Sequence, residues 1–236
     1  MPKTFDALGD FCDSLREIDI LCDAAQVAQA DQRKYSAFNK AALLLIAGKF
    51  ETFSESIVEE FVFKLNALSL PSHSIPDAIR LHHTFYALRS LDKVRNRQAQ
   101  KEAISLFCSL GKLWASEEAC SILKVESKFS FGQHGEAELI KLFEKVGVGD
   151  VFEVITLSES LETVSTETPI NSVVDFRGIF NSVTNMRNNI LHQDASPNLN
   201  TDLIRKYRQY FEVFAGRLDE HLATLLRPGA RPSRIG

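Results

Sequence analysis

One stretch of the sequence, residues 185–194, brings together side chains that could act on a phosphodiester. It contains Arg187, Asn188 and His192, at the point where a helical pattern gives way to a polar loop. A guanidinium is a rigid fork of donors that binds phosphate, and an imidazole transfers protons near neutral pH. The stretch therefore indicates phosphodiester chemistry, centred on the R-x-x-x-x-H pair Arg187 and His192.

The spacing of this pair also has a simpler interpretation, which the motif alone leaves open. A chain with this many arginines and six histidines can contain R-x-x-x-x-H by chance. Arg187 would then be a solvated helix residue, and His192 a C-terminal helix histidine favoured by the macrodipole. Structural context has to decide between the two interpretations.

Two amphipathic segments supply that context. Apolar residues recur every three or four positions on both sides of the motif, as in helices with one buried face. The first series is Val173, Val174, Phe176, Ile179, Phe180, Val183, Met186 and Ile190, and the second is Leu203, Ile204, Tyr207, Tyr210, Phe211, Phe214, Leu218, Leu222 and Leu225. We expect the motif helix to start at 169–171 and the last helix at about residue 200, with the motif at the seam between them.

This arrangement resembles the HEPN superfamily of all-α ribonucleases, and most closely its RiboL-PSP-HEPN branch. The specific element is Arg-Asn followed by His before a final amphipathic helix. Residues 41–51 look like the long early helix of that branch, with an acidic residue at Glu51, and residues 129–148 are similar to its middle segment. The resemblance covers roughly residues 10 to 226.

The resemblance implies a metal-independent endoribonuclease with no cofactor. The RNA 2′-OH would attack, His192 would transfer protons, Arg187 would bind the scissile phosphate, and Asn188 and Glu51 would position these groups. The expected products are a 2′,3′-cyclic phosphate and a 5′-hydroxyl. The family also implies a homodimer, a toxin or anti-phage role, and regulation by a partner protein such as an antitoxin.

Helix geometry bears on how the motif could assemble. Positions five apart in an ideal helix are separated by about 140° around the axis. Arg187 and His192 would therefore not share a face, unless His192 lies at or beyond the helix end and the backbone turns it back. The other solution is that two copies of the motif meet across a two-fold dimer interface, as the resemblance implies.

Two competing functions remain open. One is a non-catalytic HEPN scaffold, or an RNA- or protein-binding dimerisation module, in which Arg187 and His192 stabilise the dimer. The other is a helical adaptor whose resemblance is accidental. Leu191 and Gln193 depart from relatives that carry a small residue and a glycine at these positions, which could reduce access or cleavage rate.

Composition sets the frame for the fold. The 236 residues are 44% hydrophobic, with 11 Gly and 7 Pro, and no series of alternating strands is present. We predict an all-α, HEPN-like antiparallel bundle over residues 1–226, with inserted helices and connectors at about 70–168 and a basic flexible tail at 227–236. The helices expected before the motif cover residues 4–28 with Thr4 as N-cap, 36–68, 77–91, 97–114 and 136–146, and residues 157–168 are expected to form a connector.

The charges are unevenly distributed along the chain. The net charge of −4 excludes a generic polyanion binder. Residues 80–101 hold six Lys or Arg against one Asp, with His82 and His83 among them, and could form a solvated face or contact RNA. Residues 117–167 hold eleven acidic and four basic side chains and should face away from RNA or toward a protein partner.

Cysteine usage and hydropathy bear on the environment of the protein. Four cysteines, Cys12, Cys22, Cys108 and Cys120, lack CxxC pairing. They are expected to be buried thiols rather than disulfides or zinc ligands. No signal peptide or apolar stretch of bilayer length is present, so we expect a cytoplasmic protein.

Overall fold

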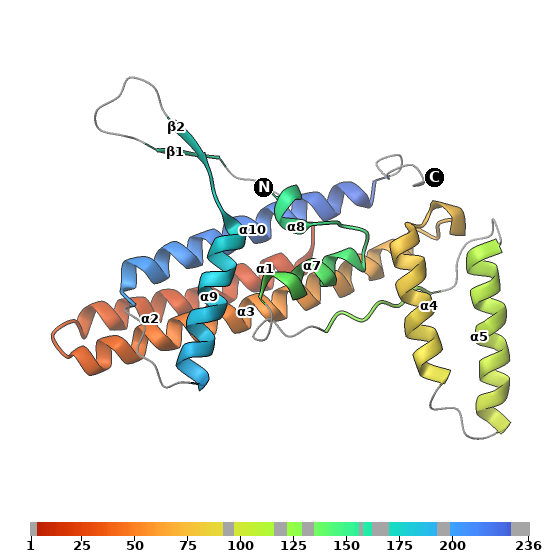
Figure 1. Ribbon diagram of the computed structural model, residues 1–236, viewed down its shortest axis with the longest axis horizontal. Coiled ribbons are helices and arrows are strands. Elements are labelled where there is room, and N and C mark those ends of the chain that lie inside the picture. Colours follow the sequence, from red (N-terminus) through yellow and green to blue (C-terminus); the bar gives the residue numbers. More distant parts are fainter. Residues whose placement is uncertain are drawn as a thin grey trace.

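The computed structural model describes residues 4–91, 97–115, 122–128, 135–155, 158–161, 170–192 and 199–227, and helices dominate it (Figure 1). In chain order the elements are α1 Asp6–Ser14, α2 Arg16–Val27, α3 Gln32–Ala67, a 3₁₀ turn at Ser72–Ser74, α4 Asp77–Leu91, α5 Arg97–Ala115, α7 Glu136–Glu144, α8 Val151–Val154, β1 Ser158–Leu161, β2 Ile170–Val173, α9 Phe176–His192 and α10 Thr201–Leu225. The predicted all-α class is confirmed, with one short hairpin added.

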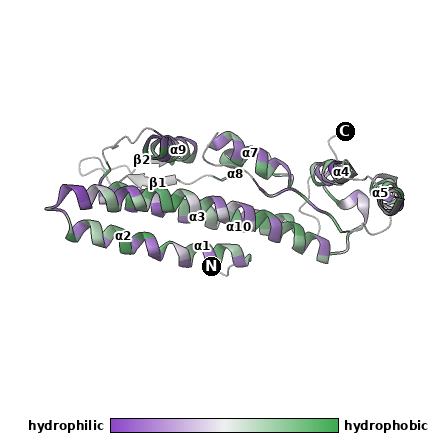
Figure 2. Cartoon of the chain, turned by 90° about the horizontal axis from the view of Figure 1, so that it is seen from below, coloured by the Kyte–Doolittle hydropathy of each residue, from purple (hydrophilic) through white to green (hydrophobic). Residues whose placement is uncertain are grey.

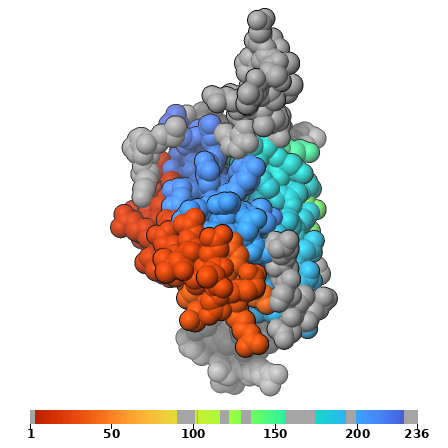
Figure 3. All heavy atoms as spheres, turned by 90° about the vertical axis from the view of Figure 1, so that its left-hand side faces the viewer, coloured from red at the N-terminus to blue at the C-terminus, as the bar shows by residue number. Residues whose placement is uncertain are grey.

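The long helices form a bundle, and the motif helix crosses it. Helices α1 and α2 run antiparallel to α3, which has 36 residues and runs along the bundle beside α10. Helices α9 and α7 lie on the opposite side of α3 from α1 and α2, and α9 crosses at a steep angle (Figure 2). Figure 3 shows the end where α2 turns into α3, with α10 and α9 beside them.

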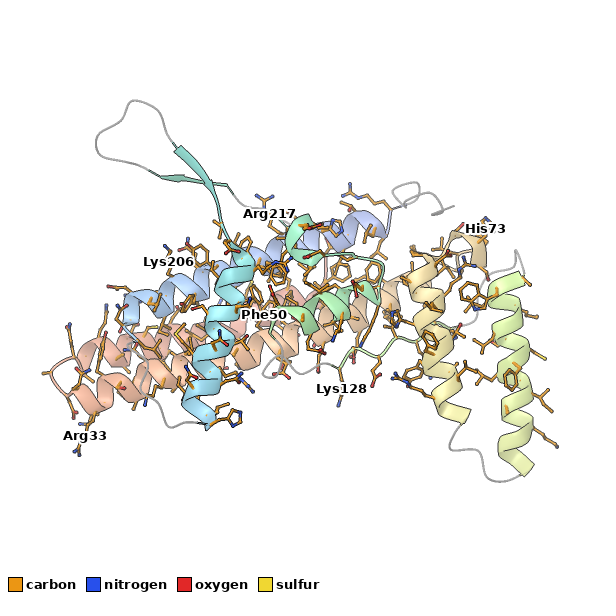
Figure 4. The ribbon with its side chains drawn as sticks, viewed as in Figure 1. Arg33, Phe50, His73, Lys128, Lys206 and Arg217 are labelled. Carbon is orange, nitrogen blue, oxygen red and sulfur yellow. The ribbon has the colours of Figure 1, made fainter. Side chains whose placement is uncertain are left out.

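A cluster of aromatic side chains joins α3 to α1, α9 and α10. Phe50 of α3, labelled in Figure 4, is fully buried and its ring contacts those of Phe11, Phe180, Phe211 and Phe214. These rings come from α1, α9 and α10, and their centroids lie 4.8–6.0 Å from that of Phe50. Aromatic pairs at such separations contribute beyond the area they bury. One residue of α3 therefore fixes where three other helices pack.

The start of the chain differs from the prediction because distant carboxylates cap it. Asp219 of α10, only 2% exposed, accepts the N–H groups of Thr4 and Phe5 at 3.2 and 2.9 Å. Glu60 of α3 accepts the next two N–H groups, both at 3.0 Å. The N-cap is Phe5, so Thr4 was the wrong residue, and a turn at Leu15 divides the predicted single helix into α1 and α2.

Two other helix starts were also wrong. Helix α3 begins at Gln32 rather than 36, because the side chain of Asp31 accepts the N–H groups of Arg33 and Lys34 and caps the helix within the expected polar break. The motif helix begins at Phe176 rather than 169–171, because residues 170–173 form β2. That strand pairs antiparallel with β1, which lies in the predicted connector, and Leu161 is opposite Ile170.

The helices from the middle of the chain lie in two different parts of the molecule. Helices α7 and α8 pack in the core through buried side chains that include Leu139, Phe143 and Phe152. Helices α4 and α5 lie beyond one end of the long helices and contact each other (Figures 1 and 2). Trp114 Nε1 of α5 donates to Thr84 Oγ1 of α4 at 2.9 Å. The division into a domain 1–226 with an insertion stays a prediction, and the tail lies outside the described residues beyond Arg227.

The cysteines agree only in part with the prediction. Cys22 is fully buried, and this burial raises the pKa of its thiol. Cys12 is half-buried, Cys120 lies outside the described residues, and Cys108 is exposed. The prediction was wrong for Cys108 because its face of α5 is turned away from the buried residues Leu110 and Leu113. None of the described helices combines the length and apolar character needed to cross a membrane.

Candidate functional site

Helix α9 carries the motif, and its apolar face holds it against the bundle. The helix begins behind Asp175, whose carboxylate accepts the N–H of Gly178 at 2.9 Å. The buried or partly buried face consists of Phe176, Phe180, Val183, Met186 and Ile190. Their spacing of three and four residues makes one stripe, which faces α3 and α10. The predicted amphipathic series is therefore what positions the motif.

The N-terminal part of α9 is anchored by charge. Arg177 pairs with Asp150 at the start of α8 and with Glu136 of α7, the latter at 3.4 Å. Its guanidinium also lies 5.4 Å from the centroid of the Phe152 ring. The hydrogen bond to Asp150 raises the pKa of Arg177. Two helices from the acidic segment thus hold this end of α9.

Close backbone packing adds a second anchor in the middle of α9. Gly135 precedes α7 with φ of 52°, and a Cβ there would lie 3.1 Å from both Asn181 Oδ1 and Thr184 Oγ1. Glycine is needed because it adopts positive φ readily and has no Cβ to clash. On the α10 side, the hydroxyls of Ser182 and Tyr207 are 3.1 Å apart. Both contacts restrict rotation of α9 about its own axis.

Two residues of the motif, Arg187 and Asn188, are hydrogen-bonded to each other. Arg187 is half-buried, and its Nη1 donates to Asn188 Oδ1 at 3.2 Å. The hydrogen bond joins neighbouring side chains, so it holds the guanidinium beside the amide without help from another helix. The amide nitrogen of Asn188 can still donate to a phosphate oxygen. The two residues can therefore present several donors to one anion.

His192 is the last residue of α9 and is exposed. It lies at the helix end, as expected, but the backbone there is still helical, so it is not turned back toward Arg187. Asn188 and His192 are four residues apart and share a face, whereas Arg187 and His192 are about 140° apart. One chain therefore does not direct the arginine and the histidine toward the same point.

The residue next to the histidine is also open to solvent. Leu191 is 50% exposed. Its neighbour Ile190 packs partly against the core. In Figure 1 the C-terminal end of α9 projects past the edge of the long helices. Gln193 lies outside the described residues.

Glu51 lies in α3 close to where α9 crosses. It follows Phe50, whose ring centroid is 4.9 Å from that of Phe180 in α9. Its side chain is half-buried, as expected for a residue at the edge of the core. The described hydrogen bond of Arg187 goes to Asn188 rather than to a carboxylate. The role of Glu51 in orienting Arg187 or His192 stays a prediction.

Two arginines of the basic segment are paired within the chain. Arg80 is 9% exposed and pairs with Asp77, and Arg89 pairs with Glu126 at 2.8 Å. Burial lowers the pKa of His82, and it also lowers that of His83, whose Nδ1 accepts the N–H of Lys124 at 2.9 Å. The described arginines of α4 therefore favour a structural interpretation over an RNA-contacting face. Residues 92–96 of this segment lie outside the described residues.

Some residues that matter for the site were not recognised from the sequence. Arg177 was missed because its partners Glu136 and Asp150 are far away in the chain. Thr184 was missed too, although the spacing Thr184, Asn188, His192 repeats every four residues and marks one face of α9. Across the residues described, no group of three or more His, Cys, Asp and Glu side chains could hold a metal ion.

Comparison with protein families gives one finding. The family model described as RiboL-PSP-HEPN matches residues 10–224, which include all of α9 and the motif. Comparisons with curated proteins and with solved structures gave no match. HEPN proteins are associated with nuclease or RNA-binding roles. Since the match covers most of the chain, this protein belongs to the RiboL-PSP-HEPN family of the HEPN superfamily.

Proposed function

We propose that this protein is a metal-independent endoribonuclease whose active site is built from two copies of the chain. The observation that carries the proposal is the contrast within α9. Arg187 and Asn188 are held together, and His192 is exposed at the projecting end of a helix that is otherwise firmly packed. A donor pair from one chain and an accessible imidazole from a second chain would together suit cleavage of RNA by its own 2′-OH.

Each motif residue has a specific role in this mechanism. One His192 accepts the proton of the 2′-OH, and a second His192 donates a proton to the leaving 5′-oxygen. Arg187 binds the scissile phosphate and offsets the negative charge that develops on it. Asn188 donates to a phosphate oxygen, and Glu51 orients a cationic partner. The products are a 2′,3′-cyclic phosphate and a 5′-hydroxyl.

Two observations support a composite site. Arg187 and His192 of one chain point in different directions around α9, so a second chain is needed to complete the set. Leu191, which is half-exposed beside His192, offers an apolar contact at the place where two copies would meet. In a two-fold interface each residue contacts the same surface on the partner, so both copies of the motif would share one cleft.

We propose a biological role from family membership. HEPN ribonucleases serve as toxins and anti-phage effectors, in which uncontrolled cleavage harms the cell. A partner protein such as an antitoxin would then control this activity. The acidic segment that carries α7 and α8 is a suitable surface for protein contact, because it would repel RNA.

The test is cleavage of end-labelled RNA in excess EDTA by the wild type, His192→Ala and Arg187→Ala at matched oligomeric state. We expect the wild type alone to cut and to leave cyclic phosphate ends. Asn185→Ala is a matched control, because Asn185 is an exposed polar residue of the same helix outside the proposed machinery. Equal cutting by wild type and mutants would contradict the assigned site.

A non-catalytic scaffold is the alternative function, and the exposure of Leu191 fits it equally well. In that case the motif region serves dimerisation or binding, and no preparation cuts RNA. His192→Ala would then change the dimer dissociation constant or partner affinity rather than a cleavage rate. Sedimentation equilibrium of the same three proteins separates these outcomes.

A further inference from the structure

A second apolar surface lies on the α4–α5 pair, far along the molecule from the motif. Its large side chains are all between 38% and 65% exposed. They are Leu81, Phe85 and Leu88 of α4, and Ile104, Phe107 and Trp114 of α5. Large exposed apolar patches on a soluble domain usually mark an interaction site. We call this set the α4–α5 face.

Helix geometry indicates that these residues form one continuous surface. The buried residues of α5 include Leu110 and Leu113. Ile104, Phe107, Gly111 and Trp114 follow one another at spacings of three, four and three residues, so they form an exposed stripe to one side of the buried residues. Trp114 bonds to Thr84 at the contact between the two helices, so the α4 stripe lies directly beside the α5 stripe. In Figures 1 and 2, α5 is the outermost helix at its end of the molecule.

A glycine lies in the middle of the α5 stripe, and no other part of the described chain packs against it. A Cβ at Gly111 would meet nothing within 4 Å. Glycine weakens a helix relative to alanine, and its usual benefit is to let another backbone or side chain approach closely. Gly111 completes the stripe as Ile104, Phe107, Gly111, Trp114. It therefore forms a notch between two large aromatic side chains.

Two arginines of α4 beside this face are paired within the chain. Arg80 pairs with Asp77 and lies 4.6 Å from the ring of Trp114, and Arg89 pairs with Glu126. These described arginines offer little to a nucleic-acid backbone or to an acidic partner. Apolar contact is what the face has to offer. A partner that matches it should be apolar and neutral at the centre.

A second copy of the same face meets these requirements. We infer that two copies of this chain pair through their α4–α5 faces, with the α5 helices antiparallel around a two-fold axis. The spacings along the stripe are three, four and three residues, which is the same sequence of spacings from either end. Antiparallel pairing therefore places each Phe107 opposite Gly111 of the other copy and each Ile104 opposite Trp114. A large ring against an open notch is the complementarity that helix pairs use.

The available area is at the lower end for such an interface. Aromatic side chains carry roughly 150–250 Å² each, and Leu81, Leu88 and Ile104 are somewhat smaller, so the six half-exposed side chains leave at most about 600 Å² on one copy. Two faces together supply at most about 1,200 Å², the lower limit for a specific interface of standard size. The motif end of α9 is on a different part of the molecule, so both contacts can form at once.

The test is the mass of the full chain in solution, by sedimentation equilibrium. Phe107→Glu and Gly111→Leu should each reduce the mass at least two-fold, because one inserts a charge and the other fills the notch. Ser105→Glu is a control on the same helix outside the stripe. Gly216→Leu is a control at another open helical glycine, in α10. Both controls should keep the wild-type mass.

The measured masses distinguish pairing through the α4–α5 face from the proposed dimer at the motif. If the motif also pairs, the wild type is larger than a dimer and Phe107→Glu leaves a dimer. If the motif does not pair, the wild type is a dimer and Phe107→Glu is a monomer. Equal masses for wild type, Phe107→Glu and Gly111→Leu would overturn the inference. Equal masses with a weakened affinity of Phe107→Glu for single-stranded RNA would also overturn it and identify an RNA-binding face.

Discussion

The two ends of α9 differ in how the rest of the molecule holds them. At the N-terminal end, Arg177 has charged partners on two other helices and Phe180 lies among four aromatic rings. At the C-terminal end, Arg187 bonds to its neighbour Asn188, and Leu191 and His192 are exposed. We call the N-terminal end of α9, with Arg177 and Phe180, its base, and the C-terminal end, residues 187–192, its tip. Other helices hold the base, whereas Leu191 and His192 of the tip are exposed.

Because of this difference, one end of α9 contributes mainly to stability and the other end is available for function. Buried contacts at the base contribute to the free energy of unfolding, and a side chain there has no access to a ligand. Exposed side chains at the tip contribute little to that free energy, but they are positioned by the base. Substitutions at the two ends should therefore produce different kinds of loss.

Phe180→Ala tests the base and should have the largest effect. The ring is fully buried and contacts rings from α3, α8 and α10, so its removal leaves a cavity. We expect a loss of about 3–5 kcal/mol in the free energy of unfolding, measured by urea denaturation. Phe63→Ala is the control, because Phe63 is 73% exposed. Equal effects of the two variants would contradict the cluster as the anchor of α9.

His192→Gln tests the tip. We expect RNA cleavage to fall about 10²–10⁴-fold, because glutamine cannot transfer protons as imidazole does. The free energy of unfolding should change by less than about 0.5 kcal/mol, since the residue is exposed. The comparison between the ends would fail if this variant unfolded as readily as Phe180→Ala.

Leu191→Glu asks whether the tip needs a second copy. A carboxylate in place of the exposed leucine should disfavour pairing of two motif ends, and the negative charge should also repel RNA. We expect cleavage to fall about tenfold at low protein concentration and to recover in part as concentration rises, because the active species is a dimer. Ile20→Glu is the matched control, an apolar residue 67% exposed on α2. A rate per chain that is independent of concentration in Leu191→Glu would argue for a monomeric site.

Arg177→Gln should weaken the base mildly. Its ion pairs are partly exposed, and such pairs contribute about 0.2–1 kcal/mol each. We expect a loss of about 1 kcal/mol in the free energy of unfolding that shrinks at high salt, with cleavage reduced only a few-fold. A variant as inactive as His192→Gln would show that Arg177 belongs to the active site.

The pH dependence of stability gives the smallest test and lies outside α9. Burial lowers the pKa of His83 in the folded protein, while the unfolded chain has a histidine pKa of about 6.5. The unfolded state therefore binds more protons below pH 6.5, and stability falls as the pH drops from 6.5 toward the folded pKa. His83→Gln should make this fall shallower. It should not remove it, because burial also lowers the pKa of His82 and His221.

The control for this measurement is His73→Gln. His73 is exposed, and its side chain is labelled in Figure 4 near the start of α4. Urea denaturation at pH 7 and pH 5 gives the slope for each protein. An unchanged slope in His83→Gln would mean that this buried imidazole does not titrate on unfolding.

The sequence by itself determined most of the helices and the residues of the motif. Periodicity of three and four residues identified α4, α5, α7 and α10 nearly to their ends, because an amphipathic helix records its buried face in its own sequence. Arg187, Asn188 and His192 were recognisable for a related reason. They lie within six residues of one another, so their spacing is visible without the fold.

Tertiary structure decided what is joined across long stretches of chain. The N–H groups at the start of α1 donate to Asp219 and Glu60, and Arg177 is anchored by Glu136 and Asp150. The exposure of Cys108 and Leu191 likewise depends on which helices cover them. Such pairings are set by packing between distant segments, and no local periodicity records them, so only the folded chain could show which end of α9 is fixed and which end is open.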